Sequence, residues 1–242
     1  MVNASPDLRV QLLAAPELTP PPGTRDTPLR GVLLTSGELD HTLGLLTLRE
    51  AAGLTVHATD PVRRALHSAF PVGPLLAPYT KADWRTVTPG RAVELDGGLV
   101  AEPLALGTKR PRYAADLPEH PAWVTGYRFT QTAGPACAVY APGLAQWTPA
   151  LELAVRTADL VLLDGTYDGP DEPTAAVGGA GHLAVQHSLP HLARHRGPRH
   201  LYTHLNNTNP LNHATTPALT AAGAAVAAEG MLIELPGAPK SA

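Results

Sequence analysis

The sequence has very little cysteine and no long apolar run. Cys137 is the only cysteine among 242 residues, which excludes an intrachain disulfide and a zinc knuckle built from cysteines, and suits a reducing compartment. No apolar run approaches the roughly 18 residues of a membrane helix. Asp7 and Arg9 lie just before the stretch Val10-Gln11-Leu12-Leu13, a poor pattern for a signal peptide. We therefore expect a cytoplasmic protein that does not associate with a membrane.

Positive charge is also scarce. Lysine and arginine together number 18 against 21 acidic residues, which gives a formal charge of −3, and the basic residues are scattered. Nucleic-acid binding requires a basic excess that this chain lacks. Hydrophobic residues make up 44% of the sequence, enough for one sizeable core. We expect a single domain over residues 1–242, in which the 26 prolines stiffen short loops.

The order of apolar runs and turn signals predicts an α/β protein. A strand over 31–35, a helix from about 39 to 51, a strand over 54–58 and a helix over 60–67 form the pattern of a parallel unit. Short β segments and hairpins are expected between residues 84 and 140. The remaining expected elements are helices over 5–13, 148–156, 182–195 and 216–228, strands before Asp164 and His204, and a last strand over 231–234.

Metal-capable side chains follow three of the predicted strands. Glu38, Asp40 and His41 follow the first, Asp164 ends a later apolar run, and His204 follows another. Loops at strand exits are where α/β sheets assemble their sites. Carboxylate oxygen and imidazole nitrogen together suit a first-row divalent metal. Our main hypothesis is a mononuclear metal centre built from these three exits.

Each acidic candidate also has a structural alternative. Thr35 and Glu38 match a capping box, and Asp40 suits the positive end of a helix. Asp164 followed by glycine is ordinary turn chemistry. The metal-binding interpretation of Asp164 therefore depends on the other two exits.

An amide-rich turn follows His204. Asn206, Asn207 and Asn209 are candidate catalytic residues, because their amides can hold a metal ligand or a substrate carboxylate by hydrogen bonds. We favour this role over that of an asparagine-rich turn ended by Pro210.

His182 follows a segment rich in glycine and proline. A histidine there can act as an acid or base, a ligand or a substrate contact, and a surface histidine at a helix start is an equal alternative. The other histidines considered are assigned to the surface or to helix packing, namely His57, His67, His187, His191, His195, His200 and His213.

Several stretches together resemble the PqqB family of pyrroloquinoline quinone (PQQ) biosynthesis. They cover most of the chain in the family's order, and His-x-Asn-Asn-Thr-Asn-Pro is a specific signature. These stretches are residues 3–9, 34–46, 140–144, 163–166, 181–182 and 204–210.

The resemblance implies the metallo-β-lactamase superfamily and its αβ/βα four-layer sandwich. It implies an iron(II)-dependent, oxygen-using hydroxylase of a tyrosine-derived or peptide-linked aromatic substrate, in PQQ or related natural-product biosynthesis. Fe(II) is the expected metal, with zinc as an alternative in purified protein. Carried over by position, the ligands would be drawn from Glu38, Asp40, His41, Asp164 and His204. Candidate substrate contacts are Tyr127, Tyr140 and Tyr167.

The chain also departs from the family. It has no cysteine-bearing N-terminal segment for a structural zinc, so we expect an N-terminally shortened fold, with a homodimer as one way to replace the opening strands. Ser36 and Glu38 replace the first two histidines of the hydrolytic His-x-His-x-Asp-His motif, and no histidine lies between His120 and His182. Because a dinuclear zinc site needs those nitrogens, a hydroxylase is favoured. A metal-dependent hydrolase and a non-catalytic carrier of a pathway intermediate are the alternatives.

Overall fold

The computed structural model describes residues 1–24, 26–169, 172 and 181–235, which form two compact units. Unit 1 contains residues 1–88 and 110–124, and unit 2 contains residues 89–109 and the described residues from 125 onward. That the two units fold as the single domain expected over residues 1–242 stays a prediction. None of the helices formed by the described residues has the length and apolar character needed to cross a lipid bilayer.

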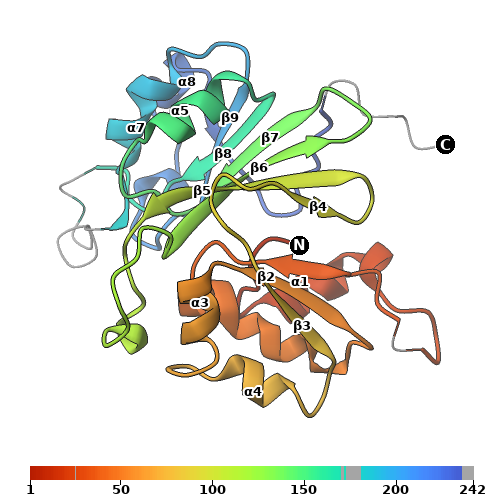
Figure 1. Cartoon of the computed structure of the whole chain (residues 1–242). Coiled ribbons are helices and arrows are strands. Elements are labelled where there is room, and N and C mark those ends of the chain that lie inside the picture. Colours follow the sequence, from red (N-terminus) through yellow and green to blue (C-terminus); the bar gives the residue numbers. More distant parts are fainter. Residues whose placement is uncertain (25, 170–171, 173–180, 236–242) are drawn as a thin grey trace. The chain divides into compact units, whose positions relative to one another are not determined.

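Unit 1 is built on a three-stranded parallel sheet. Strands β1 (Gly31–Leu33), β2 (Leu54–Ala58) and β3 (Ala82–Thr86) lie in that order, which confirms the predicted parallel unit. The helical segments of unit 1 are α1 (Leu8–Ala14), η1 (Pro16–Leu18), α2 (Leu39–Thr42), η2 (Leu43–Glu50), α3 (Asp60–Ala65), α4 (Val72–Leu76) and η3 (Arg112–Ala114). Figure 1 shows its helices α1, α3 and α4 in red and orange.

The N-terminal residues of unit 1 hold the loop that follows β1. The amide of Asn3 donates to the carbonyl of Leu33 (2.8 Å), and the amide of Ala4 donates to the carbonyl of His41 (2.7 Å). A Cβ atom on Gly44 would lie 2.1 Å from the carbonyl oxygen of Ser5. Only glycine therefore lets the N-terminal segment pack against η2.

Unit 2 is built on a seven-stranded sheet in the order β10-β9-β8-β7-β6-β5-β4. Strands β7 to β10 pair in parallel, whereas β6 pairs antiparallel with β7 and β4 antiparallel with β5. The strands are β4 (Val93–Leu95), β5 (Leu99–Gly107), β6 (Val124–Gln131), β7 (Cys137–Ala141), β8 (Leu160–Asp164), β9 (Arg199–Thr203) and β10 (Ala224–Val226).

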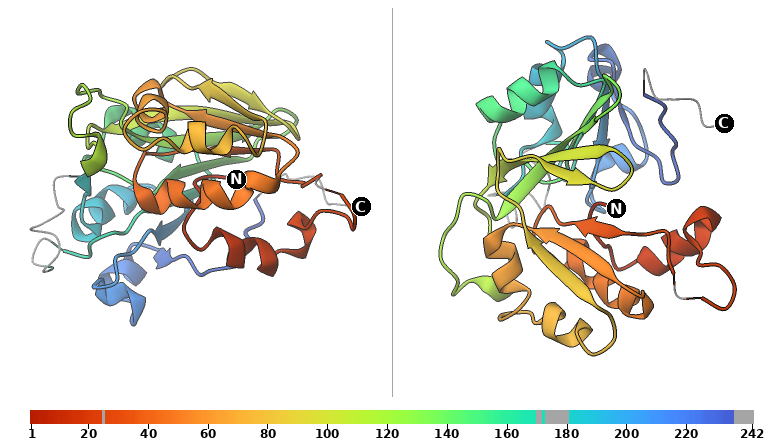
Figure 2. Two further views of the ribbon diagram at one scale, coloured as in Figure 1. Left: turned by 90° about the horizontal axis from the view of Figure 1, so that it is seen from below. Right: turned by 45° about the vertical axis from the view of Figure 1, so that its right-hand side comes forward.

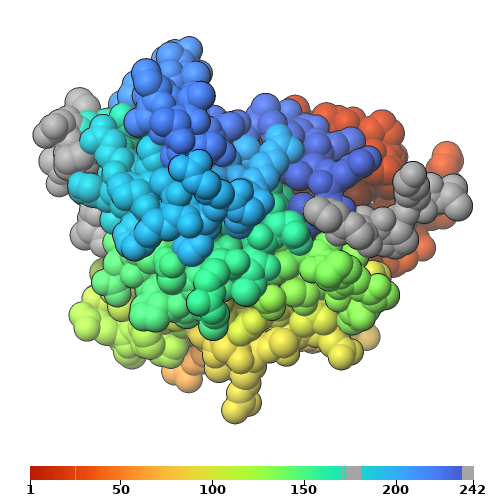
Figure 3. Space-filling view, turned by 90° about the horizontal axis from the view of Figure 1, so that it is seen from above, coloured from red at the N-terminus to blue at the C-terminus, as the bar shows by residue number. Residues whose placement is uncertain are grey.

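Helices cover the parallel part of this sheet. Figure 1 shows α5 (Pro149–Arg156), α7 (Val185–Leu192) and α8 (Pro217–Ala221) beside strands β7 to β9, and the right view of Figure 2 shows α5 along the sheet. Figure 3 shows α7 in cyan and α8 in blue at the outer surface of unit 2. Since β8 is covered in this way, it can be an apolar run of Leu and Val throughout, up to its last residue, Asp164.

Local sequence signals explain several of these elements. The hydroxyl of Thr148 accepts the amide of Leu151 (3.1 Å) at the start of α5, with Pro149 at the first helical position. Gly97 and Gly98 have positive φ angles of 82° and 72° in the turn between β4 and β5, a region that glycine enters without strain. The predicted helix start and the predicted hairpin are both confirmed.

Other predicted elements are wrong in extent or type. The helix expected over 216–228 ends at Ala221, and Ala224–Val226 instead form β10, because the free edge of β9 offers hydrogen bonds that override helix propensity. The expected strand over 231–234 is not a strand. Helix α2 continues as the 3-10 helix η2, and its N-cap is Glu38 without a side-chain cap, so the capping box from Thr35 does not form.

Candidate metal centre

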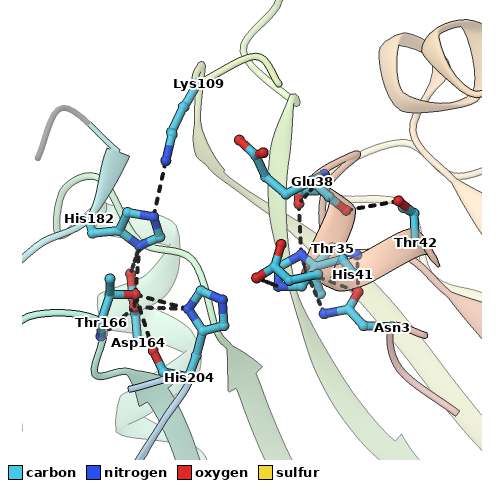
Figure 4. A network of polar contacts seen from close by, with 12 residues as sticks. Asn3, Thr35, Glu38, His41, Thr42, Lys109, Asp164, Thr166, His182 and His204 are labelled. Atoms are coloured by element: carbon cyan, nitrogen blue, oxygen red, sulfur yellow. Dashed lines mark hydrogen bonds and ion pairs between the residues drawn. The ribbon is translucent and has the colours of Figure 1, made fainter. Parts of the chain in front are cut away.

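Two histidines of unit 2 meet beside the buried carboxylate of Asp164. Asp164 is the last residue of β8, and His204 directly follows the parallel neighbour β9, whose Thr203 is paired with Asp164. His182 comes from the segment before α7. One candidate ligand atom from each of Asp164, His182 and His204 lies within 4.8 Å of the other two (Figure 4). Parallel pairing of β8 and β9 thus brings two predicted site residues together.

Both oxygens of Asp164 accept hydrogen bonds. Oδ2 accepts from the amide of Leu144 (2.9 Å) and from Nδ1 of His182 (2.7 Å), and Oδ1 accepts from the amide and hydroxyl of Thr166 (3.0 and 2.6 Å). Complete burial would raise the pKa of Asp164, but the contacts with His182 and His204 outweigh it and lower the pKa to about 2. The carboxylate is therefore ionised at neutral pH and orients the groups around it.

Thr166 links Asp164 to His204. Its hydroxyl donates to Oδ1 of Asp164 over 2.6 Å, and so its oxygen accepts from Nδ1 of His204 over 2.9 Å. His204 then carries its proton on Nδ1 and its lone pair on Nε2, the arrangement that a metal-ligating histidine needs. The sequence prediction did not include Thr166 in the site, although its position two residues after an aspartate is a known signal for side-chain to backbone bonding.

His204 has a strained backbone. Its φ angle is +60°, in the left-handed region that residues other than glycine rarely adopt. The hydroxyl oxygen of Thr166, whose proton is directed at Asp164, also lies 3.2 Å from the carbonyl oxygen of His204. Non-glycine residues in this region persist where surrounding contacts hold them, commonly at functional sites.

His182 has partners on both ring nitrogens. Nδ1 faces Asp164, and Nε2 lies 3.3 Å from the ammonium of Lys109. Its ring stacks with that of His204 at 5.7 Å between centroids, and the ring of Tyr167 lies nearly perpendicular to it at 5.9 Å between centroids. Of the three tyrosines considered as substrate contacts, Tyr167 lies beside this cluster, whereas Tyr127 is fully buried.

In unit 1, the loop between β1 and α2 orients the ring of His41. Nδ1 of His41 lies 2.7 Å from the hydroxyl of Ser36 and 3.2 Å from that of Thr35. Thr35 is held by Asn3, whose side chain bonds both its amide and its hydroxyl over 2.9 Å. With Nδ1 held in this way, Nε2 is the nitrogen suited to ligation. It lies 3.7 Å from Oδ2 of Asp40, a spacing at which both atoms can bind one ion.

Glu38 belongs to the same loop. Its amide donates to the hydroxyl of Ser36 (3.1 Å), and its carbonyl accepts from the hydroxyl of Thr42 (2.9 Å). The hydroxyl of Tyr113 donates to the carbonyl of Gly37, which fixes the loop from a second side. The ligand role of the Glu38 carboxylate stays a prediction.

The asparagines after His204 build the turn that carries it. Asn209 is buried, and its side-chain nitrogen donates to the carbonyl of Gly165 (2.6 Å). Its side-chain oxygen accepts from the backbone amide of Leu211 (2.8 Å) and so caps the 3-10 helix η5 (Pro210–Asn212). The amide of Asn206 donates to the carbonyl of Thr166 (3.2 Å), while Asn207 is exposed. Contact of these amides with a substrate stays a prediction.

Two histidines assigned to the surface or to helix packing are instead strand residues. His57 on β2 and His200 on β9 are buried within their sheets, and burial lowers the pKa of each. Their assignment to the surface or to helix packing is therefore wrong, because the identity of a residue does not show which face of a strand the fold buries. His195 does pack between helices, with Nε2 2.8 Å from Glu152 of α5.

Comparison with known proteins identifies the fold. A family model described as a beta-lactamase superfamily domain matches residues 1–205. The crystal structure of Zn(2+)-bound PqqB from Methylobacterium extorquens is 29% identical, covers 97% of this chain and 82% of that one, and has a TM-score of 0.83. A diphosphatase of the PhnP family, 19% identical with a TM-score of 0.65, shares the fold. The predicted α/β class and metallo-β-lactamase fold are confirmed, and this is a fold of metal-dependent enzymes.

Sequence relatives identify the family. Coenzyme PQQ synthesis protein B of Gluconacetobacter diazotrophicus is 36% identical over 241 residues, which cover 90% of this chain and 76% of that protein. The protein of the same name from Pseudomonas aeruginosa is 34% identical over 257 residues, covering 97% and 83%. The chain therefore belongs to the coenzyme PQQ synthesis protein B family of the beta-lactamase superfamily, a family of PQQ biosynthesis proteins.

Proposed function

We propose that this chain is an iron(II)- and O₂-dependent hydroxylase. Its substrate is an aromatic group, either tyrosine-derived or peptide-linked, in PQQ or related natural-product biosynthesis. Family membership supports the pathway. The observation that carries the chemistry is the orientation of imidazoles beside carboxylates, with His204 held by Thr166 and Asp164, and His41 next to Asp40, since such mixed sets serve non-haem iron oxygenases.

The residues fit a divalent first-row ion. His204 offers Nε2 because its Nδ1 is bonded to Thr166, and His41 offers Nε2 because its Nδ1 is bonded to Ser36. Asp40 supplies a carboxylate oxygen next to His41. The assignments of His204, His41 and Asp40 each rest on contacts within one unit. Glu38 and Asp164 are the two remaining ligands expected from the sequence.

A bound Fe(II) ion would activate dioxygen, with one oxygen atom entering the substrate and the other leaving as water at the expense of two electrons from an external reductant. The protein's own contribution is orientation and charge. Asp164 and Thr166 hold the ring of His204 in one tautomer. Asp164 also keeps a proton on Nδ1 of His182. The ring of Tyr167 packs against His182 in a T-shaped arrangement, which places an aromatic side chain beside the cluster.

A zinc-dependent hydrolase of the same fold is the second candidate. The observation that favours it is the zinc in the PqqB crystal structure from Methylobacterium extorquens. Against it, Ser36 and Glu38 occupy the positions of two histidines in hydrolytic members, and Ser36 here supports His41 rather than offering a nitrogen.

The test is metal analysis and turnover of protein purified without oxygen. With a two-electron reductant such as ascorbate present, Fe(II)-loaded protein should consume O₂ together with tyrosine or a tyrosine-containing peptide. One oxygen atom should be added to the substrate, detected by mass spectrometry, and the other should be reduced to water. Zinc-loaded protein should be inactive. Activity with zinc and no oxygen consumption would establish the hydrolase instead. Metal-free protein that binds the peptide as well as the loaded protein, without turnover, would indicate a carrier.

A further inference from the structure

A lysine outside the predicted site reaches the cluster of unit 2. Lys109 follows β5 by two residues, and its ammonium nitrogen lies 3.3 Å from Nε2 of His182. Figure 4 shows Lys109 directed at His182 from the side opposite Asp164. The side chain is half-buried. It therefore places a positive charge at the rim of the cluster rather than in open solvent.

The hydrogen bonds of His182 define its tautomer. An ionised carboxylate can only accept, so the 2.7 Å contact with Asp164 requires a proton on Nδ1 of His182. An ammonium can only donate, so the contact with Lys109 requires a lone pair on Nε2. In this arrangement Nε2 of His182 orients the ammonium of Lys109 without offering a negative charge to counter it.

Gly181 makes room for the lysine. A Cβ atom at this position would lie 2.1 Å from Cδ of Lys109 and 3.1 Å from its Cε. Any larger residue would displace the aliphatic stem of Lys109. The glycine before His182 thus lets the lysine and the histidine approach each other.

The charge of Lys109 has no acidic partner in the described part of unit 2. None of the ion pairs among the described residues joins a carboxylate to the ammonium of Lys109 within 4.0 Å. Asp164 is the one carboxylate in this cluster of described residues, and its oxygens already accept four hydrogen bonds. A metal ion at the cluster would add further positive charge. The rim of the cluster is therefore suited to an anion, because an ammonium with spare donors binds carboxylate through charge-assisted bonds.

We propose that Lys109 binds a carboxylate group of the substrate, oriented by its bond to His182. This inference rests on the proposed function, in that the bound molecule is an aromatic acid. Lys109 would select substrates that carry a free carboxylate near the ring and would hold them beside His204.

The test measures binding without turnover. The probe is para-hydroxyphenylpropionate, compared with its uncharged amide, and dissociation constants are measured by NMR titration of metal-free and zinc-loaded protein. Lys109→Met should weaken carboxylate binding roughly tenfold, the expected loss of one charge-assisted bond, and leave amide binding unchanged. Lys109→Arg should retain most of the affinity. The control is Lys81→Met, at an exposed lysine of unit 1, which should change neither probe.

Three outcomes would overturn the proposal. Carboxylate and amide could bind equally to the unaltered protein, Lys109→Met could leave the carboxylate affinity intact, or the protein could bind inorganic phosphate through Lys109 and not the carboxylate. The binding test uses neither oxygen nor iron. If carboxylate binding depends on Lys109 but the protein never hydroxylates a substrate, the proposed function is refuted and the role of Lys109 stands.

Discussion

The hydroxyl of Thr166 lies 2.9 Å from Nδ1 of His204. The same hydroxyl donates to the buried carboxylate of Asp164, and so a chain of two hydrogen bonds fixes the ring of a candidate metal ligand. Outer partners of this kind commonly contribute 10- to 100-fold to metal affinity. Asp164 can thus support metal binding in two ways, by orienting His204 through Thr166 and by binding the ion directly.

Thr166→Val should weaken metal binding by about tenfold or more, because the isosteric side chain cannot bond His204 or Asp164. Thr166→Ser keeps the hydroxyl and should bind metal nearly as well as the unaltered protein. Competition with a chromogenic chelator measures both affinities. Thr157→Val, at an exposed helix end, is the matched control. Equal affinities for the Val and Ser variants would show that the hydroxyl does not support the site.

His41→Ala and His204→Ala should each lower the metal content of protein purified without oxygen to near zero, since the sequence predicts that both histidines bind the same ion. Elemental analysis gives the number of ions per chain, which should be about one in the unaltered protein. His213→Ala, at an exposed histidine, should retain full occupancy. Full occupancy in both site variants would refute the ligand assignment, and loss in only one would refute a single shared ion.

Acid should destabilise the metal-free protein through Asp164. Burial would raise the pKa of this carboxyl, but its contacts with His182 and His204 lower it from 3.8 to about 2. A lowered pKa stabilises the folded state above the unfolded-state pKa, and this contribution is lost as the pH falls from about 4 to about 2. The loss amounts to about 2 kcal/mol.

Urea unfolding over this pH range, followed by circular dichroism, measures that loss. Asp164→Asn removes the titrating group, and the stability of this variant should depend less on pH between 4 and 2 by the same amount. An identical pH dependence in both proteins would show that Asp164 is not held ionised by its partners.

Asn209 and Asn207 should behave differently although both belong to the same motif. Asn209→Ala should reduce the free energy of unfolding by about 1–3 kcal/mol, because it leaves the buried carbonyl of Gly165 and the amide of Leu211 without their partners. Asn207→Ala, at an exposed position, should change stability by less than about 0.5 kcal/mol. Thermal unfolding gives both values. Unchanged stability of Asn209→Ala would remove the structural role, and loss of turnover in Asn207→Ala alone would support a substrate contact there.

Much of the fold could be predicted because its signals are local. The apolar run of β8 and the Thr148-Pro149 start of α5 each lie within a few neighbouring residues. The glycine turn between β4 and β5 is equally local. Strand exits with Asp164 and His204 could also be recognised, since an apolar run followed by a polar residue marks the end of a buried strand. The family signature after His204 pointed to the same place.

Local patterns failed where a distant segment decided the outcome. Ala224–Val226 have helical composition but complete the sheet beside β9. His57 and His200 look like surface residues in the sequence, yet both are buried within their sheets. Composition cannot show which strand edge remains available or which face a helix will cover, because both depend on pairing between segments far apart in the chain.

The sequence by itself determined the family, the α/β class and the set of imidazoles and carboxylates available for a metal. Only the tertiary structure showed that Thr166 joins Asp164 to His204 across 38 positions and that Lys109 meets His182 across 73. The physical reason is that side-chain identity limits which atoms can donate, accept or ligate, whereas the pairing of β8 with β9 and the path of the chain after β5 decide which of those atoms lie within bonding distance.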